Sequence, residues 1–450
     1  MNVHFIAIGG SVMHQLAIAL RLKGNNITGS DDEIFDPAKS NLHKAGILPA
    51  SPGWFPEKIT SEIDAVILGM HAKDDNPELL KAKELGLQIF SYSEYIYQES
   101  INKMRVAVAG SHGKTSTTAI IMHVLQFACK DFDYLAGAPL KGFHQSVNIT
   151  AAPVIICEAD EYPASVIEKR PKFHFLFPQL AVITGIAWDH INIFPTFEIY
   201  VEQFEIFLDT IAPGGLLVYN ETDETLQKLI NKNTRIDIRY QPYHLPDYFI
   251  EDGKTSIIIE DNKTSLQIFG NHNLMNLNAA FFVCKELGIS TEIFVKAIGS
   301  FNGASLRLEL ISSAETSNIY RDFAHAPSKV KASVDAVKQQ FPDRKLIAIL
   351  ELHTYSSLNE IFLKEYEDTM NPADIALVFY SGHALALKRL PLLPKQKVVE
   401  GFQKDNLVVL TEKDELENWL QRQQYSNTNL LLMSSGNFEG IDILNTINGQ

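Results

Sequence analysis

Residues 110–116 of the chain, Gly-Ser-His-Gly-Lys-Thr-Ser, have the types and spacing of a loop that binds nucleotide phosphates. They follow an apolar run, 104–109, that is typical of a buried strand, and they precede 117–125, which has the pattern of a helix. A glycine-rich turn in that setting points several backbone N–H groups at one spot, at the positive end of the helix dipole. The lysine adds a mobile cation, and the threonine hydroxyl can bind Mg²⁺. We therefore predict a triphosphate site, for ATP or GTP, at Gly110, Ser111, His112, Gly113, Lys114, Thr115 and Ser116.

This loop departs from the common nucleotide-binding motif, in which another glycine stands five positions before the last one. That position is Val108, so only the shorter form Gly-Ser-His-Gly-Lys-Thr remains. An ordinary strand-to-helix turn that ends in Gly-Lys-Thr is the alternative. The strand before the loop and the helix after it favour the nucleotide site, because the motif requires that context.

Composition excludes several classes of protein. A length of 450 residues indicates roughly two to four domains, and 46% hydrophobic residues suffice for sizeable cores. The net charge of −15 argues against nucleic acid as a partner. No apolar run reaches about 18 residues, and the first residues predict a strand that enters a glycine turn, not a signal peptide. With three dispersed cysteines, we expect a cytoplasmic protein whose partners are small molecules, with neither a membrane nor nucleic acid among them.

Strand-like and helical patterns alternate along the chain, which predicts an α/β fold with largely parallel sheets. The first unit opens with a strand at 3–8, a glycine turn, and an acidic residue, Asp31, about 20 positions later, as in dinucleotide-binding folds. The first glycine of that pattern is replaced by Ala7 and the third is absent, so a plain strand–helix–strand turn is the alternative. This unit is expected to end near Lys103. Its candidate substrate-binding residues are Gly9, Gly10, Ser11, Asp31 and His71.

The second unit has acidic residues and a histidine where its strands end. An apolar run at 154–157 leads to Glu158, and another at 180–184 leads towards His190. Ligand chemistry gathers at the carboxyl ends of strands in such sheets, and oxygen ligands combined with substrate phosphates suit Mg²⁺. Beside the phosphate loop, these residues predict a Mg²⁺ site. The alternatives are an ordinary strand-end carboxylate for Glu158 and a core or capping histidine for His190.

Polar residues farther along the chain can complete a nucleotide site. Asn273 and Asn276 share a helical face and can read an adenine edge, although helix capping is the alternative for a single asparagine. Arg307 stands between two leucines and can reach a terminal phosphate or form a salt bridge at a domain boundary. Asp322 and His325 precede a predicted helix in a third unit of the chain.

Along its whole length the chain resembles the Mur ligases. The resemblance rests on motifs that occur in this order: the turn at 9–10, residues 110–116, Glu158-Ala159-Asp160-Glu161, Asp189-His190, Gly270-Asn271-His272-Asn273 with Asn276, Arg307, and Asp322 with His325. It implies three domains. They are a Rossmann-like UDP-sugar-binding domain at 1–103, a central ATP-binding P-loop domain at 104–311, and a Rossmann-like domain at 312–450 that admits the amine.

The resemblance also implies a reaction that belongs to peptidoglycan synthesis, with ATP and Mg²⁺ as cofactors. The γ-phosphate of ATP activates the carboxylate of UDP-N-acetylmuramate as an acyl phosphate, and an amine then attacks it. The implied catalytic residues are Lys114, His190 and Arg307, and the implied Mg²⁺ ligands are Thr115, Glu158 and His190. The resemblance implies that Asn273 and Asn276 face the adenine. It also implies that Asp322 and His325 reach the nucleotide from the last domain.

Two departures from the family pattern are evident. Many members carry a carbamoylated lysine as a Mg²⁺ ligand downstream of the histidine, whereas this chain has no lysine between His190 and Lys228. Glu202 or Glu205 is an alternative source of the negative charge. The second departure is Ala326, since the alanine-adding branch of the family typically has two adjacent histidines there.

The amine distinguishes two activities within the branch that uses UDP-N-acetylmuramate itself. Residues 161–162 with 169–173, 322–325 and 433–441 look like those of enzymes that add the recycled tripeptide L-Ala-γ-D-Glu-meso-diaminopimelate, whereas 73–79 looks like enzymes that add L-alanine. We expect the tripeptide, with L-alanine as the alternative. A regulator that binds a nucleotide or UDP-sugar without ligation is a third hypothesis, against which the intact phosphate loop argues.

Overall fold

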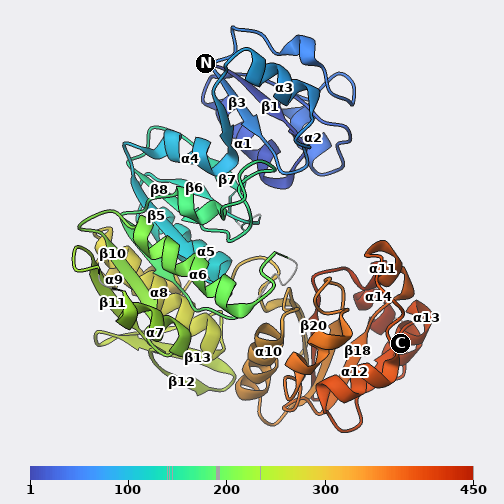
Figure 1. Ribbon diagram of the computed structural model, residues 1–450. Helices are drawn as coiled ribbons and strands as arrows, with labels where there is room; N and C mark the ends of the chain where they lie inside the picture. Colours follow the sequence, from blue (N-terminus) through green and yellow to red (C-terminus); the bar gives the residue numbers. More distant parts are fainter. Residues whose placement is uncertain (139, 141, 144, 189–192, 234, 449–450) are drawn as a thin grey trace. The chain divides into compact units, whose positions relative to one another are not determined.

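The computed structural model describes residues 1–138, 140, 142–143, 145–188, 193–233 and 235–448 (Figure 1). The chain divides into two compact units, each described here by itself. The first unit consists of Met1–Ile186, Glu198–His244 and Ala279–Phe294. The second consists of Ala187–Phe197, Leu245–Asn278 and Val295–Gln450.

The smaller sheet of the first unit has the strand order β2-β1-β3-β4, and all its strands run parallel. Its inner strands β1 and β3 are buried almost throughout, as expected where helices cover both faces of a parallel sheet. Side chains of Asn76 and Ser91 cap the helices α3 and α4, so local sequence sets where both begin. The elements are β1 (Asn2–Ile6), α1 (Ser11–Leu22), β2 (Asn26–Ser30), α2 (Ala38–Lys44), η1 (Pro56–Lys58), β3 (Ala65–Leu68), α3 (Pro77–Glu84), β4 (Ile89–Ser91) and α4 (Tyr92–Ser100).

The larger sheet of the first unit has the order β11-β10-β9-β5-β8-β6-β7 and is parallel except for the β6–β7 pair. Because β5 lies between β8 and β9, the carboxyl ends of these three strands meet at one edge. The elements are β5 (Met104–Ala109), α5 (Lys114–Phe127), β6 (Asp133–Leu135), β7 (Val147–Asn148), β8 (Val154–Glu158), η2 (Lys172–Phe175), β9 (Leu180–Ile183), α6 (Phe197–Thr210), β10 (Leu216–Asn220), α7 (Glu224–Lys232) and β11 (Arg239–Tyr243). Two further helices, α8 (Asn271–Glu286) and α9 (Thr291–Ile298), have residues in both units.

The second unit contains a small antiparallel sheet, β12-β13-β14, and a larger sheet with the order β15-β16-β20-β17-β18-β19. The larger sheet is parallel except for the β15–β16 pair. Its elements, with those of the small sheet, are β12 (Asp247–Glu251), β13 (Lys254–Ile259), β14 (Asn262–Ser265), β15 (Glu309–Ser313), β16 (Asn318–Asp322), α10 (Pro327–Gln340), β17 (Lys345–Glu351), η3 (Glu360–Tyr366), β18 (Ile375–Phe379), α11 (Gly382–Leu387), α12 (Lys395–Phe402), β19 (Val408–Leu410), α13 (Lys413–Gln421), β20 (Thr428–Met433), η4 (Phe438–Gly440) and α14 (Ile443–Asn448).

Alternate residues of the central strands face two different cores. Leu346, Ala348 and Leu350 of β17 pack with α10, η3 and α12, whereas Ile347 and Ile349 of the same strand pack with α13, η4 and α14. The chain therefore leaves β17 towards one face of the sheet and leaves its neighbour β20 towards the other. Such a reversal opens a crevice at the carboxyl ends of the two strands, which is where α/β sheets bind ligands.

The predicted α/β class with largely parallel sheets is confirmed. The helix expected after the phosphate loop is α5, and the strand expected before it is β5. The boundary expected at 311–312 falls within β15, and the compact units group Leu245–Asn278 with the last part of the chain. The division into three domains stays a prediction. Among the described residues, none of the helices is both long enough and apolar enough to cross a membrane.

The side chain of Arg105 ties the start of β5 to its surroundings. It is 6% exposed, and its guanidinium donates to the main-chain carbonyls of Leu176 (2.9 Å) and Ser100 (2.8 Å). Its central carbon also lies 5.1 Å from the ring centroid of Tyr97 on α4. A buried charge is tolerated when hydrogen bonds satisfy it. Arg105 thus holds the end of α4 and the segment after η2 against the strand that carries the phosphate loop.

Replacement of Arg105 by leucine should lower the thermal unfolding temperature by several degrees. The buried carbonyl groups of Leu176 and Ser100 would each lose a donor, and each such loss costs about 1–3 kcal/mol. Circular dichroism melting measures the shift. Arg21→Leu, on an exposed position of α1, is the matched control and should change the temperature little. Equal melting of the Arg105→Leu protein and the unaltered one would contradict the role assigned to this side chain.

Candidate active site

The loop at 110–116 begins where β5 ends, in the middle of the larger sheet of the first unit. Gly110 and Gly113 have φ angles of +123° and +82°, a region that favours glycine. A Cβ on Gly110 would lie 2.8 Å from the amide nitrogen of Thr184, so no side chain fits there. Ser111 N–H donates to the carbonyl of Gly185 at 3.0 Å. The backbone of the loop is therefore packed against the end of β9, and α5 starts directly after it at Lys114.

Lys114 is held by groups of the loop and by a neighbouring carboxylate. Its ammonium donates to the carbonyl of Gly110 (2.6 Å) and to Oε2 of Glu161 (2.8 Å), and the Glu161 residue is only 1% exposed. Burial alone would lower the pKa of Lys114, but Glu161, Asp160 and Glu158 outweigh it and raise the pKa. The lysine is therefore charged, and a bound phosphate would compete with a carboxylate for it.

Thr115 and Glu158 lie where Mg²⁺ ligands are expected. The Thr115 hydroxyl donates to Glu158 Oε1 at 2.7 Å, and Gly137 N–H donates to Oε2 at 2.8 Å. Two hard oxygen donors beside a phosphate loop fit Mg²⁺, which usually takes its other ligands from water and substrate phosphates. Within the described ranges no group of three or more His, Cys, Asp or Glu side chains could hold a metal ion. His190, the other expected ligand, lies outside the described residues.

Tyr200 is a member of this site that sequence reasoning missed. It lies fully buried on α6, and its hydroxyl is 2.9 Å from Ser111 Oγ and 3.3 Å from Glu161 Oε1. A tyrosine in an amphipathic helix is usually a core residue, so no local signal identifies this contact. Glu202 is exposed on the same helix and Glu205 pairs with Lys232 at 3.0 Å. Glu161 lies at the loop, where it pairs with Lys114.

A cavity of about 290 Å³ is lined by residues from both sheets of the first unit. The structure brings together three predicted site residues in its wall: Ser11 from the turn after β1, Lys114 from the phosphate loop, and Glu158 from the end of β8. Two residues that form an ion pair, Asp160 and Lys172 (2.6 Å), also line it. The other lining residues are Val12, Tyr92, Ser93, Leu135, Ala136, Gly137 and Leu176.

Asp31 stabilises the glycine turn of the first sheet. Its Oδ2 accepts the N–H of Gly9 at 2.7 Å, and a Cβ on Gly9 would lie 2.9 Å from that oxygen. Burial raises the pKa of Asp31 to about 6, against the opposing effect of the Gly9 hydrogen bond. Gly10 begins α1 as its N-cap residue, and His71 is exposed after the neighbouring strand β3.

The remaining predicted nucleotide contacts lie in the second unit. Asn273 and Asn276 are largely buried on α8, and Asn273 donates to the carbonyl of Phe269 at 2.9 Å. The guanidinium carbon of Arg307 lies 4.9 Å from the ring centroid of Phe323. Asp322 accepts the Ser333 hydroxyl at 2.5 Å, and His325 Nδ1 lies 2.8 Å from the carbonyl of Phe323. These contacts order the segments around β16 and α10, and the predicted nucleotide roles stay predictions.

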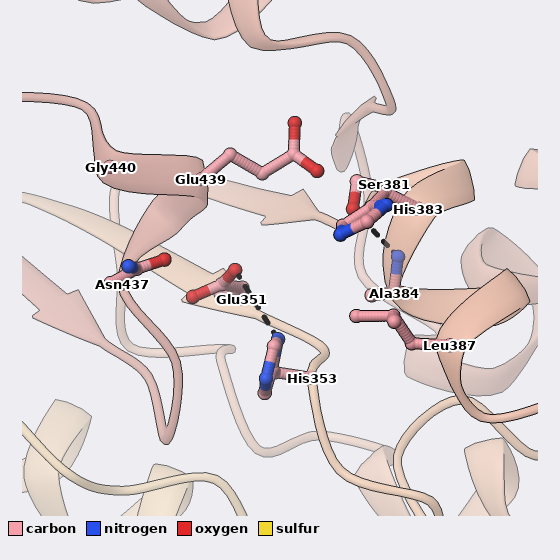
Figure 2. Close-up of a pocket in the computed structure, with 9 residues that line it drawn as sticks. All are labelled: Glu351, His353, Ser381, His383, Ala384, Leu387, Asn437, Glu439 and Gly440. Atoms are coloured by element: carbon pink, nitrogen blue, oxygen red, sulfur yellow. Dashed lines mark hydrogen bonds and ion pairs between the residues drawn. The ribbon is translucent and has the colours of Figure 1, made fainter. Parts of the chain in front are cut away.

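A second cavity, of about 500 Å³, lies at the crevice where β17 and β20 end (Figure 2). We call it the strand-end cavity; its lining residues are Glu351, His353, Ser381, His383, Ala384, Leu387, Asn437, Glu439 and Gly440. At 433–441 the sequence by itself shows a family likeness and no cavity. The missed signal is that polar residues follow three strands, β17, β18 and β20, whose carboxyl ends lie side by side.

Comparison with known proteins agrees with this architecture. The Mur ligase middle domain matches residues 108–284, and the Mur ligase family catalytic domain matches residues 2–101. The chain is similar to the UDP-N-acetylmuramate–L-alanine ligase of Aquifex aeolicus, with 30% identity over 81% of each chain. It is also similar to that of Carboxydothermus hydrogenoformans, with 29% identity over 98% of this chain and 95% of the relative.

Two solved structures have the same fold over the whole chain. One is the murein peptide ligase of Psychrobacter arcticus, with a TM-score of 0.65, 22% identity, and coverage of 100% of this chain and 99% of that one. The other is the UDP-N-acetylmuramate–alanine ligase of Thermotoga maritima, with a TM-score of 0.68, 22% identity, and coverage of 100% and 98%. The fold and the phosphate loop are those of an ATP-dependent acid–amino acid ligase. The chain belongs to the Mur ligase family, as its motifs predict.

Substitution of Tyr200 by phenylalanine should weaken binding of a non-hydrolysable ATP analogue about three- to tenfold. The ring still fills its buried place, while the hydrogen bonds that join Ser111 to Glu161 are lost. Isothermal titration calorimetry measures the dissociation constant. Tyr240→Phe, whose hydroxyl bonds the Arg235 carbonyl at 3.1 Å, is the control and should bind normally. An unchanged dissociation constant in Tyr200→Phe would show that this hydroxyl does not organise the loop.

Proposed function

We propose that this enzyme joins the carboxylate of UDP-N-acetylmuramate to the amine of L-alanyl-γ-D-glutamyl-meso-diaminopimelate at the expense of ATP. The cavity that contains Ser11, Lys114 and Glu158 carries the proposal. It puts the glycine turn expected to bind a UDP-sugar beside the loop expected to bind triphosphate. A ligase of this family needs that adjacency, because a substrate carboxylate must meet the γ-phosphate.

The residues of the first unit suit phosphoryl transfer to a carboxylate. The carboxylate oxygen attacks the γ-phosphorus, ADP leaves, and an acyl phosphate forms. Two anions approach one another, so cations must neutralise them. Lys114 supplies one such cation when its ammonium leaves the Glu161 carboxylate and binds a phosphate oxygen. The N–H groups of the loop bind the other phosphate oxygens. Mg²⁺ held by Thr115 and Glu158 would supply further charge neutralisation.

The second step is attack of the amine nitrogen on the acyl carbon, with release of inorganic phosphate and one proton. We assign the amine substrate to the strand-end cavity. The cavity lies at the point where β17 and β20 diverge, and α/β sheets bind ligands at such points. A volume of about 500 Å³ with several polar walls suits a peptide better than an amino acid with a methyl side chain.

L-Alanine is the second candidate for the amine. The curated relatives named above are L-alanine ligases, and the likeness to a solved peptide ligase concerns the fold. The two amines share the chemistry of the reacting groups, so a measurement of turnover decides between them.

Purified protein with ATP, Mg²⁺, UDP-N-acetylmuramate and the tripeptide should release phosphate and form a product with the combined mass of both substrates less one water. Lys114→Ala should reduce turnover about a hundredfold or more, since it removes a cation from the transition state. Lys130→Ala, at an exposed position, is its control. Product with L-alanine alone would refute the tripeptide assignment, and ATP binding without product from either amine would support a regulator.

The affinity for UDP-N-acetylmuramate should fall as the pH drops below about 6. Burial raises the pKa of Asp31 to about 6, and its ionised carboxylate is the better acceptor for a ribose hydroxyl, so protonation weakens binding. Above pH 7 the dissociation constant should no longer depend on pH. Calorimetric titrations between pH 5 and 8 measure the profile, and Asp31→Asn should lack the Asp31 step. The same profile in both proteins would show that Asp31 does not take part in binding.

A further inference from the structure

The segment that follows β8 folds back on itself as a narrow loop. The N–H of Lys172 donates to the carbonyl of Tyr162 at 2.8 Å, which joins the two limbs of the loop. The N–H of Phe173 donates to the carbonyl of Asp160 at 3.1 Å. Phe173 is fully buried, and its ring stacks on that of Phe207 with the centroids 4.8 Å apart. Because both limbs are fixed, the backbone of Lys172 is fixed as well.

The side chain of Lys172 lines the cavity of about 290 Å³ that also contains Lys114 and Glu158. Its ammonium lies 2.6 Å from Oδ2 of Asp160, whose Oδ1 accepts the N–H of Tyr162 at 3.3 Å. Burial would raise the pKa of Asp160, but Lys172 and Lys114 outweigh it and lower the pKa. One carboxylate therefore interacts with both ammonium groups, which places the two cations at the same end of the cavity.

That end of the cavity has one cation for each of two anions. In the proposed function the γ-phosphate binds Lys114, and a carboxylate must then approach the phosphorus. A lysine already engaged by phosphate neutralises that group, so the approaching carboxylate needs a cation of its own. The diphosphate of the sugar nucleotide is expected elsewhere, at the amino end of α1, where Gly10 is the N-cap residue and Ser11 lines the cavity. Lys172 is therefore available to the carboxylate.

Tyr92 gives independent support for a polar ligand in this cavity. Its side chain lines the cavity and is 4% exposed, and among the described residues its hydroxyl has no hydrogen-bond partner. Burial raises the pKa of Tyr92, so the hydroxyl stays a donor. A buried hydroxyl without a partner costs free energy that a ligand oxygen would restore.

We propose that Lys172 binds the acceptor carboxylate of UDP-N-acetylmuramate and holds it against the γ-phosphate, while Asp160 orients the lysine. The inference rests on the proposed function and adds a substrate-binding residue to it. In the step concerned, a bond forms between a carboxylate oxygen and phosphorus, and the bond from phosphorus to the ADP oxygen breaks. Lys172 keeps its proton throughout and contributes only its charge.

Lys172→Met should weaken binding of UDP-N-acetylmuramate to the full-length protein at least about tenfold, as measured by isothermal titration calorimetry. UDP-N-acetylglucosamine has the same nucleotide and lacks the carboxylate, so it should bind the variant and the unaltered protein alike. Lys172→Arg keeps the charge and should bind UDP-N-acetylmuramate more tightly than Lys172→Met. Lys169→Met, exposed and outside the cavity, is the matched control. Equal weakening for both sugar nucleotides, or for neither, would overturn the inference.

Turnover at saturating UDP-N-acetylmuramate gives a second measurement. In Lys172→Met, kcat should also fall at least about tenfold, because the carboxylate is no longer held against the γ-phosphate. A lysine that bound only the diphosphate would change KM and leave kcat as it is, and that result would contradict the assignment.

The double variant Asp160→Asn/Lys172→Met excludes simple repulsion, because Lys172→Met leaves the Asp160 carboxylate without its ammonium. The double variant should bind UDP-N-acetylmuramate as weakly as Lys172→Met, and recovery of the affinity would overturn the inference. Product with L-alanine alone would refute the tripeptide and leave Lys172 in its role, since the acceptor carboxylate is the same. Absence of UDP-N-acetylmuramate binding to the unaltered protein would refute the proposed function and the inference together.

Discussion

The packing of the phosphate loop against the end of β9 is the constraint on which the rest of this site depends. Gly110 can approach Thr184 so closely only because it has no Cβ, and its left-handed conformation turns the chain back towards α5. If the loop lay farther from the sheet, its N–H groups would no longer converge on one phosphate. The order of the strands follows from the same requirement, since β8 and β9 must flank β5 for their polar ends to reach the loop.

Charge balance is the second organising principle. A buried ammonium is costly without a partner, and Glu161 is that partner for Lys114. In the proposed function, a bound triphosphate would therefore compete with Glu161 for this ammonium. In the strand-end cavity of the second unit, Glu351 is likewise held by protein groups, since it accepts the Phe438 N–H at 2.9 Å.

Much of the fold could be predicted from the sequence, because its signals are local. Buried parallel strands are short apolar runs, and the β5–loop–α5 unit has every feature within about 20 consecutive residues. Boundaries between units were less predictable. Residues 245–278 follow the nucleotide-binding sheet in sequence, yet they group with the last part of the chain, where Thr255 bonds Gln340 at 2.8 Å. Such long-range contacts cannot be predicted from the local pattern of residues in the sequence.

The sequence by itself determined the chemistry of the phosphate loop, the class of fold and the family, since each depends on residues that are neighbours in the chain or on motifs in a set order. Only the tertiary structure decided which distant side chains meet. Tyr200 reaches Ser111 and Glu161 from another helix, and Glu439 shares a cavity with His383 from another strand end. The physical reason is that sheet register and helix packing align these residues, and neither is encoded within one segment.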